Sequence, residues 1–261
     1  MGKQNSSHDI FLGVDIGSIL TKAVLLRDGE VLSYKIMPSG RDYAGVFNEI
    51  KNSLLGGGEA KGEVITGYGT SKLSVRRVSD LLCHGRGINF LFPGVRTIIE
   101  IGGQASRVIR IDERGKVLDF VVSEKCAAGS GRFLQVIANV LRIPFEEIGE
   151  LSLKSKNPVS FTTGCAVFAE TEAISRVAEG YRVEDILYGV HVSIATKVKS
   201  LVERIGLVGE CAVTGGGAKD KGLIRALEEK LSIPLLIPPE PLITGALGAA
   251  IIASEQSPTS P

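Results

Sequence analysis

Apolar residues in the first part of the chain fall into short runs that turn residues separate. The runs occupy residues 11–17, 18–26 and 31–34, and Asp28-Gly29 lies between the last two. An Asp-Gly pair between alternating hydrophobic residues is the strongest short-range signal for a β-hairpin. The pattern therefore predicts three strands that tight turns connect.

The same pattern returns in the second part of the chain, at residues 97–103, 104–111 and 117–122. Superposing Asp15-Ile16-Gly17 on Glu100-Ile101-Gly102 also aligns Lys22 with Arg107, because both pairs lie 85 positions apart. One extra residue in the second turn then aligns residues 29–32 with 115–118. We interpret the match as duplication of a three-stranded unit.

Longer segments carry apolar residues three or four positions apart, the spacing of helices that cover a sheet. The predicted helices span residues 42–55, 72–82, about 130–141, 169–178, 183–205 and a last one from about 244. Cys83 is expected to end the second of these helices. Further strands are predicted at residues 63–66 and 210–214. Strands and helices in this order indicate an α/β fold with two lobes that face each other across a cleft.

The repeat also suggests where the domains begin and end. We expect an N-terminal lobe at residues 10–94, closed by the C-terminal helix 244–253, and a C-terminal lobe at residues 95–243. Residues 1–9 and the Ser/Pro-rich residues 254–261 are expected to be flexible tails.

Composition narrows the range of partners. The 261 residues include 30 basic and 29 acidic side chains, which leaves a net charge of +1. Nucleic acids and anionic membranes normally require clustered Lys and Arg, so neither is an expected partner. The longest nearly uncharged apolar stretch, residues 242–253, has 12 residues, whereas a membrane span needs about 20. The first residues lack the apolar core of a secretory signal, so we expect a cytoplasmic location.

One turn has the parts of a phosphate-binding loop. A Gly- and Ser-rich turn after a strand presents backbone N–H groups to phosphate oxygens, and a nearby carboxylate can hold Mg²⁺ through water. Asp15, Gly17, Ser18 and Lys22 supply these groups in order. By itself, this segment is explained equally well as an ordinary tight hairpin.

Two further segments favour a nucleotide-binding role for this turn over the interpretation as an ordinary hairpin. The duplicated turn contains Glu100, Gly102, Gly103 and Gln104, and a glycine cluster, Gly215-Gly216-Gly217, follows a predicted strand. The chain contains no P-loop motif, and no dinucleotide-binding glycine motif lies between a strand and a helix. The expected nucleotide site is therefore of a different type.

These three segments, in this order, resemble the superfamily of actin, sugar kinases and heat-shock chaperones. The resemblance implies duplicated actin-like (ribonuclease H-like) lobes, each a mixed sheet with helices, around a nucleotide cleft. Within that superfamily, residues 10–253 resemble the ATPase activators of 2-hydroxyacyl-CoA dehydratases and the related ATPase subunits of benzoyl-CoA reductase. The motifs that carry this resemblance are Glu63 to Thr70, Asp80 to Gly87, Arg96 to Gln104, Lys125 to Gln135 and Phe161 to Ser175.

The resemblance implies a role for each loop in binding ATP or ADP with Mg²⁺. Asp15, Glu100 and Gln104 are the expected catalytic residues, which place Mg²⁺ and water. The other expected binding residues are Gly17, Ser18 and Lys22 in the first phosphate loop, Gly102 and Gly103 in the second, and Gly215, Gly216 and Gly217 at the adenosine. The second loop departs from the family pattern, because Ala105 stands where a carboxylate is usual and Glu100 replaces the commoner Asp.

The four cysteines are Cys83, Cys126, Cys165 and Cys211, and no two form a CxxC pair. Cys126 and Cys165 each lie near the start of a predicted helix, where the helix dipole favours a thiolate. On the residues alone, a small buried apolar side chain explains them as well. The resemblance implies instead that they bind one [4Fe-4S] cluster shared across a homodimer, because two ligands per chain need two chains.

The remaining candidate residues have ordinary explanations. Cys83 and Cys211 are expected in the core, and His84 beside Cys83 makes no metal site by itself. His191 is expected to serve in packing or at the surface. Arg132 either neutralises the cluster or forms a salt bridge.

The resulting hypothesis is an ATP-dependent one-electron reductase that works as an activator. It would accept an electron from a ferredoxin- or flavodoxin-type donor and deliver it to an iron-sulfur dehydratase or reductase. Three alternatives remain open at this stage. They are an ATPase subunit of a benzoyl-CoA reductase, a small-molecule kinase of the same fold and a non-catalytic, actin-like assembly protein.

Overall fold

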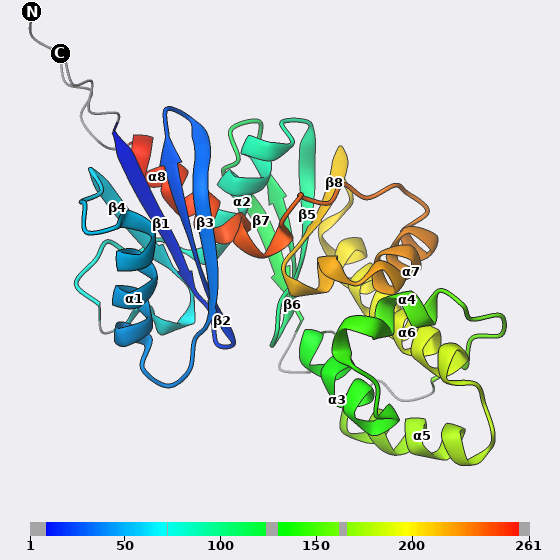
Figure 1. The fold of residues 1–261 in the computed structure, drawn as a ribbon. Coiled ribbons are helices and arrows are strands. Elements are labelled where there is room, and N and C mark those ends of the chain that lie inside the picture. The colour runs from blue at the N-terminus through cyan, green and yellow to red at the C-terminus, as the bar shows by residue number, and fades with distance from the viewer. Residues whose placement is uncertain (1–8, 72, 124–129, 162–165, 256–261) are drawn as a thin grey trace, which may run out of the picture. The chain divides into compact units, whose positions relative to one another are not determined.

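The computed structural model describes residues 9–71, 73–123, 130–161 and 166–255. The chain separates into two compact units, each with its own four-stranded sheet. Unit 1 comprises residues 1–93, 113–117 and 242–261, and unit 2 comprises residues 94–112 and 118–241. Figure 1 labels the elements of both units.

The sheet of unit 1 has the strand order β3-β2-β1-β4, with β1, β2 and β3 antiparallel and β4 parallel to β1. Asp28 and Gly29 connect β2 to β3 with positive φ angles of 53° and 80°, which is the twisted turn that an Asp-Gly pair favours. The strands are β1 (Ile10–Ile16), β2 (Leu20–Arg27), β3 (Glu30–Pro38) and β4 (Gly62–Thr66).

Helices cover both faces of this sheet (Figure 1). Helix α1 (Tyr43–Leu55) packs with Leu12, Val14 and Ile16, which point to one face of β1. Helix α8 (Thr244–Glu255) packs on the opposite face and also contacts α2 (Asp80–Leu91). Because side chains alternate along a strand, Asp15 lies on the α8 face of β1.

The sheet of unit 2 has the matching order β7-β6-β5-β8, with β8 parallel to β5. Its strands are β5 (Val95–Ile101), β6 (Ser106–Ile111), β7 (Val117–Val122) and β8 (Glu210–Thr214). One hydrophobic core joins this sheet to the helices of unit 2. The helices are α3 (Gly131–Leu141), α4 (Ile148–Ser152), α5 (Ala166–Ala178), α6 (Val183–Ile205) and α7 (Lys221–Leu231).

The predicted duplication is present in the hydrogen-bond register of the two sheets. Asp15 pairs with Lys22 across β1 and β2, and Glu100 pairs with Arg107 across β5 and β6. The repeat also extends beyond the three-stranded unit. Each parallel strand, β4 or β8, ends in Thr-Gly and leads into a 3-10 turn, η1 (Tyr68–Thr70) or η4 (Gly216–Lys219).

The helix predicted at residues 72–82 is wrong. Residues 76–78 instead run beside β4, where Ile65 N–H donates to the Arg76 carbonyl and Val78 N–H donates to the Ile65 carbonyl. Helix α2 begins at Asp80, so Cys83 lies in its first turn and does not end a helix. The apolar spacing of this segment fits a helix, but the open hydrogen-bonding edge of β4 decides its conformation.

The other predicted helices are present, and their ends differ from the prediction by a few residues at most. Helix α6 spans the predicted residues 183–205, α1 and α3 begin one residue later than predicted, and α5 begins three residues earlier. Helices α4 and α7 were not predicted. Four of the last seven residues of α7 are charged. They made the apolar face formed by Leu223, Ile224 and Leu227 difficult to recognise in the sequence.

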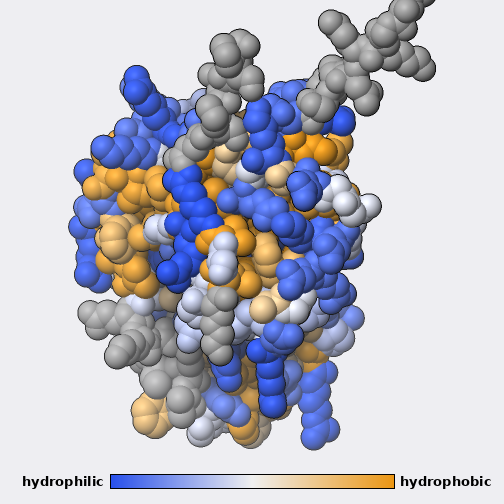
Figure 2. Space-filling model, turned by 90° about the vertical axis from the view of Figure 1, so that its left-hand side faces the viewer, coloured by the Kyte–Doolittle hydropathy of each residue, from blue (hydrophilic) through white to orange (hydrophobic). Residues whose placement is uncertain are grey.

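No helix within the described ranges is long and apolar enough to cross a membrane. Figure 2 shows hydrophilic side chains scattered among hydrophobic ones over the face it presents.

Candidate functional site

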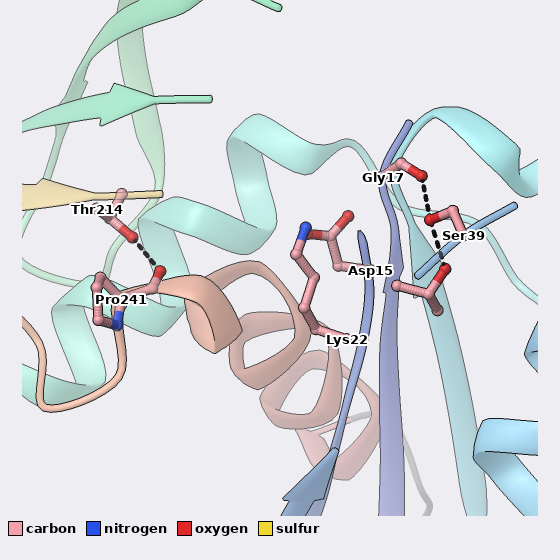
Figure 3. A network of polar contacts seen from close by, with 7 residues as sticks. Asp15, Gly17, Lys22, Ser39, Thr214 and Pro241 are labelled. Atoms are coloured by element: carbon pink, nitrogen blue, oxygen red, sulfur yellow. Dashed lines mark hydrogen bonds and ion pairs between the residues drawn. The ribbon is translucent and has the colours of Figure 1, made fainter. Parts of the chain in front are cut away.

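The first candidate phosphate loop lies between β1 and β2, at the end of β1. Asp15 and Lys22 face each other across these strands, and Lys22 Nζ lies 2.8 Å from Asp15 Oδ2. The two side chains retain 11% and 14% of their exposure, so the pair is largely removed from solvent. Figure 3 shows the ammonium group turned toward the carboxylate. A fixed cation beside a carboxylate is thus held at the mouth of the loop.

Hydrogen bonds hold the backbone of this loop in a tight turn. Gly17 N–H donates to the Leu20 carbonyl at 3.1 Å, and the Ser39 hydroxyl donates to the Gly17 carbonyl at 2.6 Å. The hydroxyl groups of Ser39 and Thr21 lie 2.9 Å apart, which ties β2 to the same point (Figure 3). Gly17 and Ser18 remain partly exposed. The turn is therefore rigid at its base and accessible at its tip.

The second candidate phosphate loop repeats this construction in unit 2. Arg107 Nε lies 3.5 Å from Glu100 Oε2, and Gly102 N–H donates to the Ala105 carbonyl at 3.0 Å. Glu100 Oε2 is buried and has no hydrogen-bond partner within the described part of the chain. Such an orphaned acceptor is costly unless a ligand, an ion or water satisfies it. Gly102 and Gly103 are partly exposed and Gln104 is exposed, as loop residues that contact a ligand must be.

The second loop is joined directly to helix α3. Gly131 N–H donates to the Gly102 carbonyl at 2.9 Å, and Arg132 N–H donates to the Gly103 carbonyl at 3.2 Å. These donors belong to the first turn of the helix, which has no intrahelical acceptors for them. The loop that contains Gly102 and Gly103 therefore supplies acceptors to the start of α3. The backbone of Arg132 makes this link, and its side chain is exposed.

The glycine cluster after β8 lies against the second loop. Gly215 has a φ of 83°, and a Cβ on it would lie 2.6 Å from the Ile101 carbonyl oxygen and 3.3 Å from Glu100 Oε1. The Thr214 hydroxyl donates to the Pro241 carbonyl (Figure 3), and the Gly215 N–H donates to the same carbonyl. The backbone here needs a glycine, because a side chain has no room and positive φ is unfavourable.

Sequence reasoning missed the counterpart of this cluster in unit 1. Gly67 follows β4 with a φ of 94°, and a Cβ on it would lie 2.5 Å from Asp15 Oδ1 and 2.6 Å from the Ile16 carbonyl oxygen. The signal was available, because Thr66-Gly67-Tyr68-Gly69 matches Thr214-Gly215-Gly216-Gly217 in the sequence. Each phosphate loop thus packs against a glycine turn of its own unit.

Asp15 and Glu100 are each suited to supply one carboxylate ligand to a magnesium ion whose other ligands are mainly those of a nucleotide. Among the described residues no group of three or more His, Cys, Asp or Glu side chains forms a metal cage. Mg²⁺ is usually bound by one or two carboxylates together with phosphates and water. Asp15 at one loop and Glu100 at the other match that donor set, each as a single carboxylate.

The candidate cluster ligands, Cys126 and Cys165, lie outside the described residues. Helix α5 begins at the residue after Cys165, and α3 begins five residues after Cys126. Cys83 and Cys211 are buried in the cores as predicted, and burial raises the pKa of each thiol to about 12. Both thiols are packed in hydrophobic clusters, and no group of three or more metal-ligating side chains forms around them within the described part of the chain.

The two buried histidines differ in their contacts. His191, expected in packing or at the surface, is fully buried in α6, and its Nε2 lies 2.9 Å from Asp220 Oδ2. Asp220 in turn caps α7 through the Leu223 N–H. His84 lies in α2 of unit 1, and its Nδ1, like that of His191, has no hydrogen-bond partner within the described ranges.

The sequence matches known proteins along nearly its whole length. A family model described as the BadF/BadG/BcrA/BcrD ATPase family matches residues 12–253. The 2-hydroxyisocaproyl-CoA dehydratase activator of Clostridioides difficile is 40% identical over 256 residues, or 95% of this chain and 96% of the relative. One of the benzoyl-CoA reductase subunits of Thauera aromatica is 35% identical over 259 residues, or 93% of this chain and 92% of the relative.

Solved structures confirm the predicted fold. The activator of the 2-hydroxyisocaproyl-CoA dehydratase from Clostridium difficile with bound ADPNP has a TM-score of 0.89 at 38% identity, covering 95% of both chains. A ROK family glucokinase from Streptomyces griseus has a TM-score of 0.61 at 15% identity, covering 94% of this chain and 99% of the other, and shows a shared fold alone. The fold is the duplicated actin-like α/β fold.

Proposed function

Because the chain belongs to the BadF/BadG/BcrA/BcrD ATPase family, we propose that it activates a 2-hydroxyacyl-CoA dehydratase-type enzyme. The protein is an ATPase. The observation that carries the proposal is the 40% identity to a dehydratase activator over 95% of the chain. In the proposed activity, ATP hydrolysis drives the delivery of single electrons to an iron-sulfur enzyme.

The two phosphate loops bind ATP in this proposal. The backbone of Gly17 and Ser18 and the Lys22 ammonium bind phosphate oxygens, and the 2.8 Å contact with Asp15 keeps that ammonium in place. Gly102, Gly103 and Gln104 serve the same purpose in the second loop, and Gly215 to Gly217 bind the adenosine. Asp15 and Glu100 orient Mg²⁺ and water. Fixed charges of this kind stabilise the transition state of phosphoryl transfer because they need no reorganisation.

The cluster ligands in the proposal are Cys126 and Cys165 of each of two chains. Burial supports this set, since the remaining cysteines, Cys83 and Cys211, lie inside the hydrophobic cores where a cluster shared between two chains has no access. Four thiolates then require a homodimer. When bound, a [4Fe-4S] cluster supplies a site that takes up and releases one electron at low potential.

The start of helix α3 supports a link between nucleotide and cluster. The Gly102 and Gly103 carbonyls accept hydrogen bonds from Gly131 and Arg132, five and six residues after Cys126 in the sequence. A change in the second phosphate loop therefore reaches α3 without an intermediate element. A ferredoxin- or flavodoxin-type protein is the proposed electron donor.

A second candidate function is that of the ATPase subunit of a benzoyl-CoA reductase, in which the chain is one member of a heteromer. The 35% identity to a subunit of such a reductase favours it. The two functions differ in which protein assembly binds the iron-sulfur cluster. An activator forms a cluster-bearing homodimer by itself, whereas a reductase subunit needs its partners.

Anaerobic purification of the natural chain tests the proposal. We expect brown protein with about four irons per dimer, and loss of iron in Cys126→Ala and in Cys165→Ala. Cys83→Ala and Cys211→Ala are matched controls, which should retain the iron because both thiols lie in the cores. Full iron content in either of the first two variants would contradict the ligand assignment. A colourless monomer would favour the heteromeric alternative.

A further inference from the structure

The part of unit 1 around Asp15 contains a histidine that the ATP-binding residues do not account for. His84 is 7% exposed, and its Nδ1 is buried without a hydrogen-bond partner within the described part of the chain. Orphaned polar atoms of this kind are rare in folded proteins, and each needs an explanation such as a catalytic role or an ordered water.

The atoms around Gly245 show that the ring of His84 lies close to the Asp15 carboxylate. A Cβ on Gly245 would lie 3.3 Å from Asp15 Oδ2 and 3.3 Å from His84 Nε2. Apart from the chain neighbours of Gly245 and the backbone of its own helix, no described residue comes as near to that point. The carboxylate and the imidazole therefore border one small space beside the first turn of α8, and the absence of a side chain at residue 245 leaves this space open.

The composition of this space suits a water molecule. An ordered water needs two to four polar partners, and Asp15 Oδ2 and His84 Nε2 provide two. A buried N–H without an acceptor is rarer than a bare acceptor, so the neutral ring should carry its proton on Nε2. His84 then donates to the water, and the water donates to Asp15, whose carboxylate the Lys22 ammonium holds in place.

We propose that His84, together with Asp15, holds the water that attacks ATP. In this step, the water oxygen bonds to the γ-phosphorus as the bond between that phosphorus and the bridging oxygen breaks. ADP leaves with the electron pair of the broken bond, and the proton of the water leaves on inorganic phosphate. His84 contributes by positioning the water, which is the main task of a protein in phosphoryl transfer. The inference rests on the ATPase activity and does not depend on the iron-sulfur cluster.

The test compares steady-state ATP hydrolysis, ADPNP affinity and thermal midpoint in the purified full-length protein and its variants. His84→Ala should lower kcat about tenfold or more, with KM and ADPNP affinity within about twofold of the natural protein. His84→Gln should recover part of kcat, because its amide reaches the position of Nε2. His84→Asn should not, because its amide lies nearer the position of Nδ1. Cys83→Ala, in the same helical turn, is the control and should leave kcat unchanged.

Gly245→Ala keeps the test decisive if the histidine variants fail to fold. The added methyl group lies 3.3 Å from both Asp15 Oδ2 and His84 Nε2, so these side chains must shift by a few tenths of an ångström while the methyl occupies the space between them. We expect kcat to fall, and the thermal midpoint shows whether the variant keeps its fold. An unchanged kcat in folded His84→Ala or Gly245→Ala would overturn the proposal. So would a loss of ADPNP affinity that matches the loss of kcat. Protein that hydrolyses ATP but lacks iron would contradict the cluster-bearing homodimer and leave this result standing.

Discussion

Two ion pairs at equivalent positions in the repeat differ in how completely they are satisfied. The Asp15–Lys22 contact is short, at 2.8 Å. The Glu100–Arg107 contact is longer, at 3.5 Å, and leaves Glu100 Oε2 without a hydrogen bond within the described residues. The other oxygen of Glu100, Oε1, lies beside both Gly102 and Gly215, whereas Oδ1 of Asp15 lies beside Gly67. The two carboxylates therefore have different environments, and we expect different roles in placing Mg²⁺ and water.

Removing the cation of the first pair tests its place in the ATP site. Lys22→Ala should weaken ADPNP binding by a factor of about 10 or more, or about 1.4 kcal/mol, because a fixed charge near the phosphates is lost. Calorimetric titration measures the affinity. Lys51→Ala is the matched control, since Lys51 pairs with Glu63, which lies opposite Leu12 on β1 rather than opposite Asp15, and it should bind ADPNP as the natural protein does. Unchanged affinity in Lys22→Ala would remove the first loop from the ATP site.

At the scale of elements, helix α6 fixes the position of residues 155–159, which precede Cys165 in the sequence. Asp185, in its first turn, accepts hydrogen bonds from the Ser155 hydroxyl and from the N–H groups of Lys156 and Asn157. The Val159 N–H donates to the Asp185 carbonyl. Gly189 leaves the room that the Val159 carbonyl needs, because any side chain there would collide with it. The first turn of α6 is thus the anchor of residues 155–159.

This anchor predicts a dependence of stability on pH. The Asn157 N–H and the Ser155 hydroxyl are the main causes that lower the pKa of Asp185. A lowered pKa in the folded state stabilises the protein above the ordinary carboxyl pKa, and the contribution is lost as pH falls. Asp185→Asn should therefore lower the free energy of unfolding near pH 7, by roughly 1.5 kcal/mol for hydrogen bonds to a charged group.

Urea unfolding at several pH values measures this effect. The difference between the natural protein and Asp185→Asn should be constant above about pH 5 and should shrink below about pH 4. Glu184→Gln is the control, because Glu184 pairs with Arg182 at the surface and should change stability little. A difference that is independent of pH would show that the Asp185 charge does not provide the stabilisation.

At the scale of the whole molecule, the duplication gives each unit one carboxylate, one cation and one glycine turn. The halves diverge after their third strands. Unit 1 continues through α1, whereas unit 2 continues through α3, α4, α5 and α6 before its fourth strand. The proposed cluster ligands precede two of the inserted helices, α3 and α5, in the sequence, and α3 is hydrogen-bonded to the second candidate phosphate loop. Unit 2 therefore combines a candidate nucleotide loop with the proposed cluster site.

Ala105 lies in that loop and offers a test of communication through it. Ala105→Asp restores the carboxylate usual at this position and should raise ATP turnover, because it adds an acceptor for water or Mg²⁺ beside Gly102. If nucleotide and cluster are coupled, the reduction potential should differ between ADP and ADPNP, since coupling free energies are reciprocal. The measurement is a redox titration of both proteins with both nucleotides. Four identical potentials would show that the chain binds nucleotide and cluster without coupling them.

Short-range sequence pattern alone was enough to predict many of the strands and helices and the repeat. Alternating apolar residues and the Asp28-Gly29 turn predicted β1 to β3 and their repeat, because strand period and turn chemistry act over a few residues. The 3.6-residue period predicted α6 to the residue. The equivalence of Asp15 with Glu100 and of Lys22 with Arg107 followed from the same repeat and is confirmed by their register.

Contacts between distant segments decided the rest. Residues 76–78 have a helical apolar spacing but pair with β4, since an unpaired strand edge gains more from hydrogen bonds than a short helix gains from propensity. Asp15, His84 and Gly245 come from three parts of the chain, and only the packing of β1, α2 and α8 brings them to one space. Sequence by itself determines features whose energies are local, whereas the environment of Asp15 depends on the packing of side chains more than 60 positions apart.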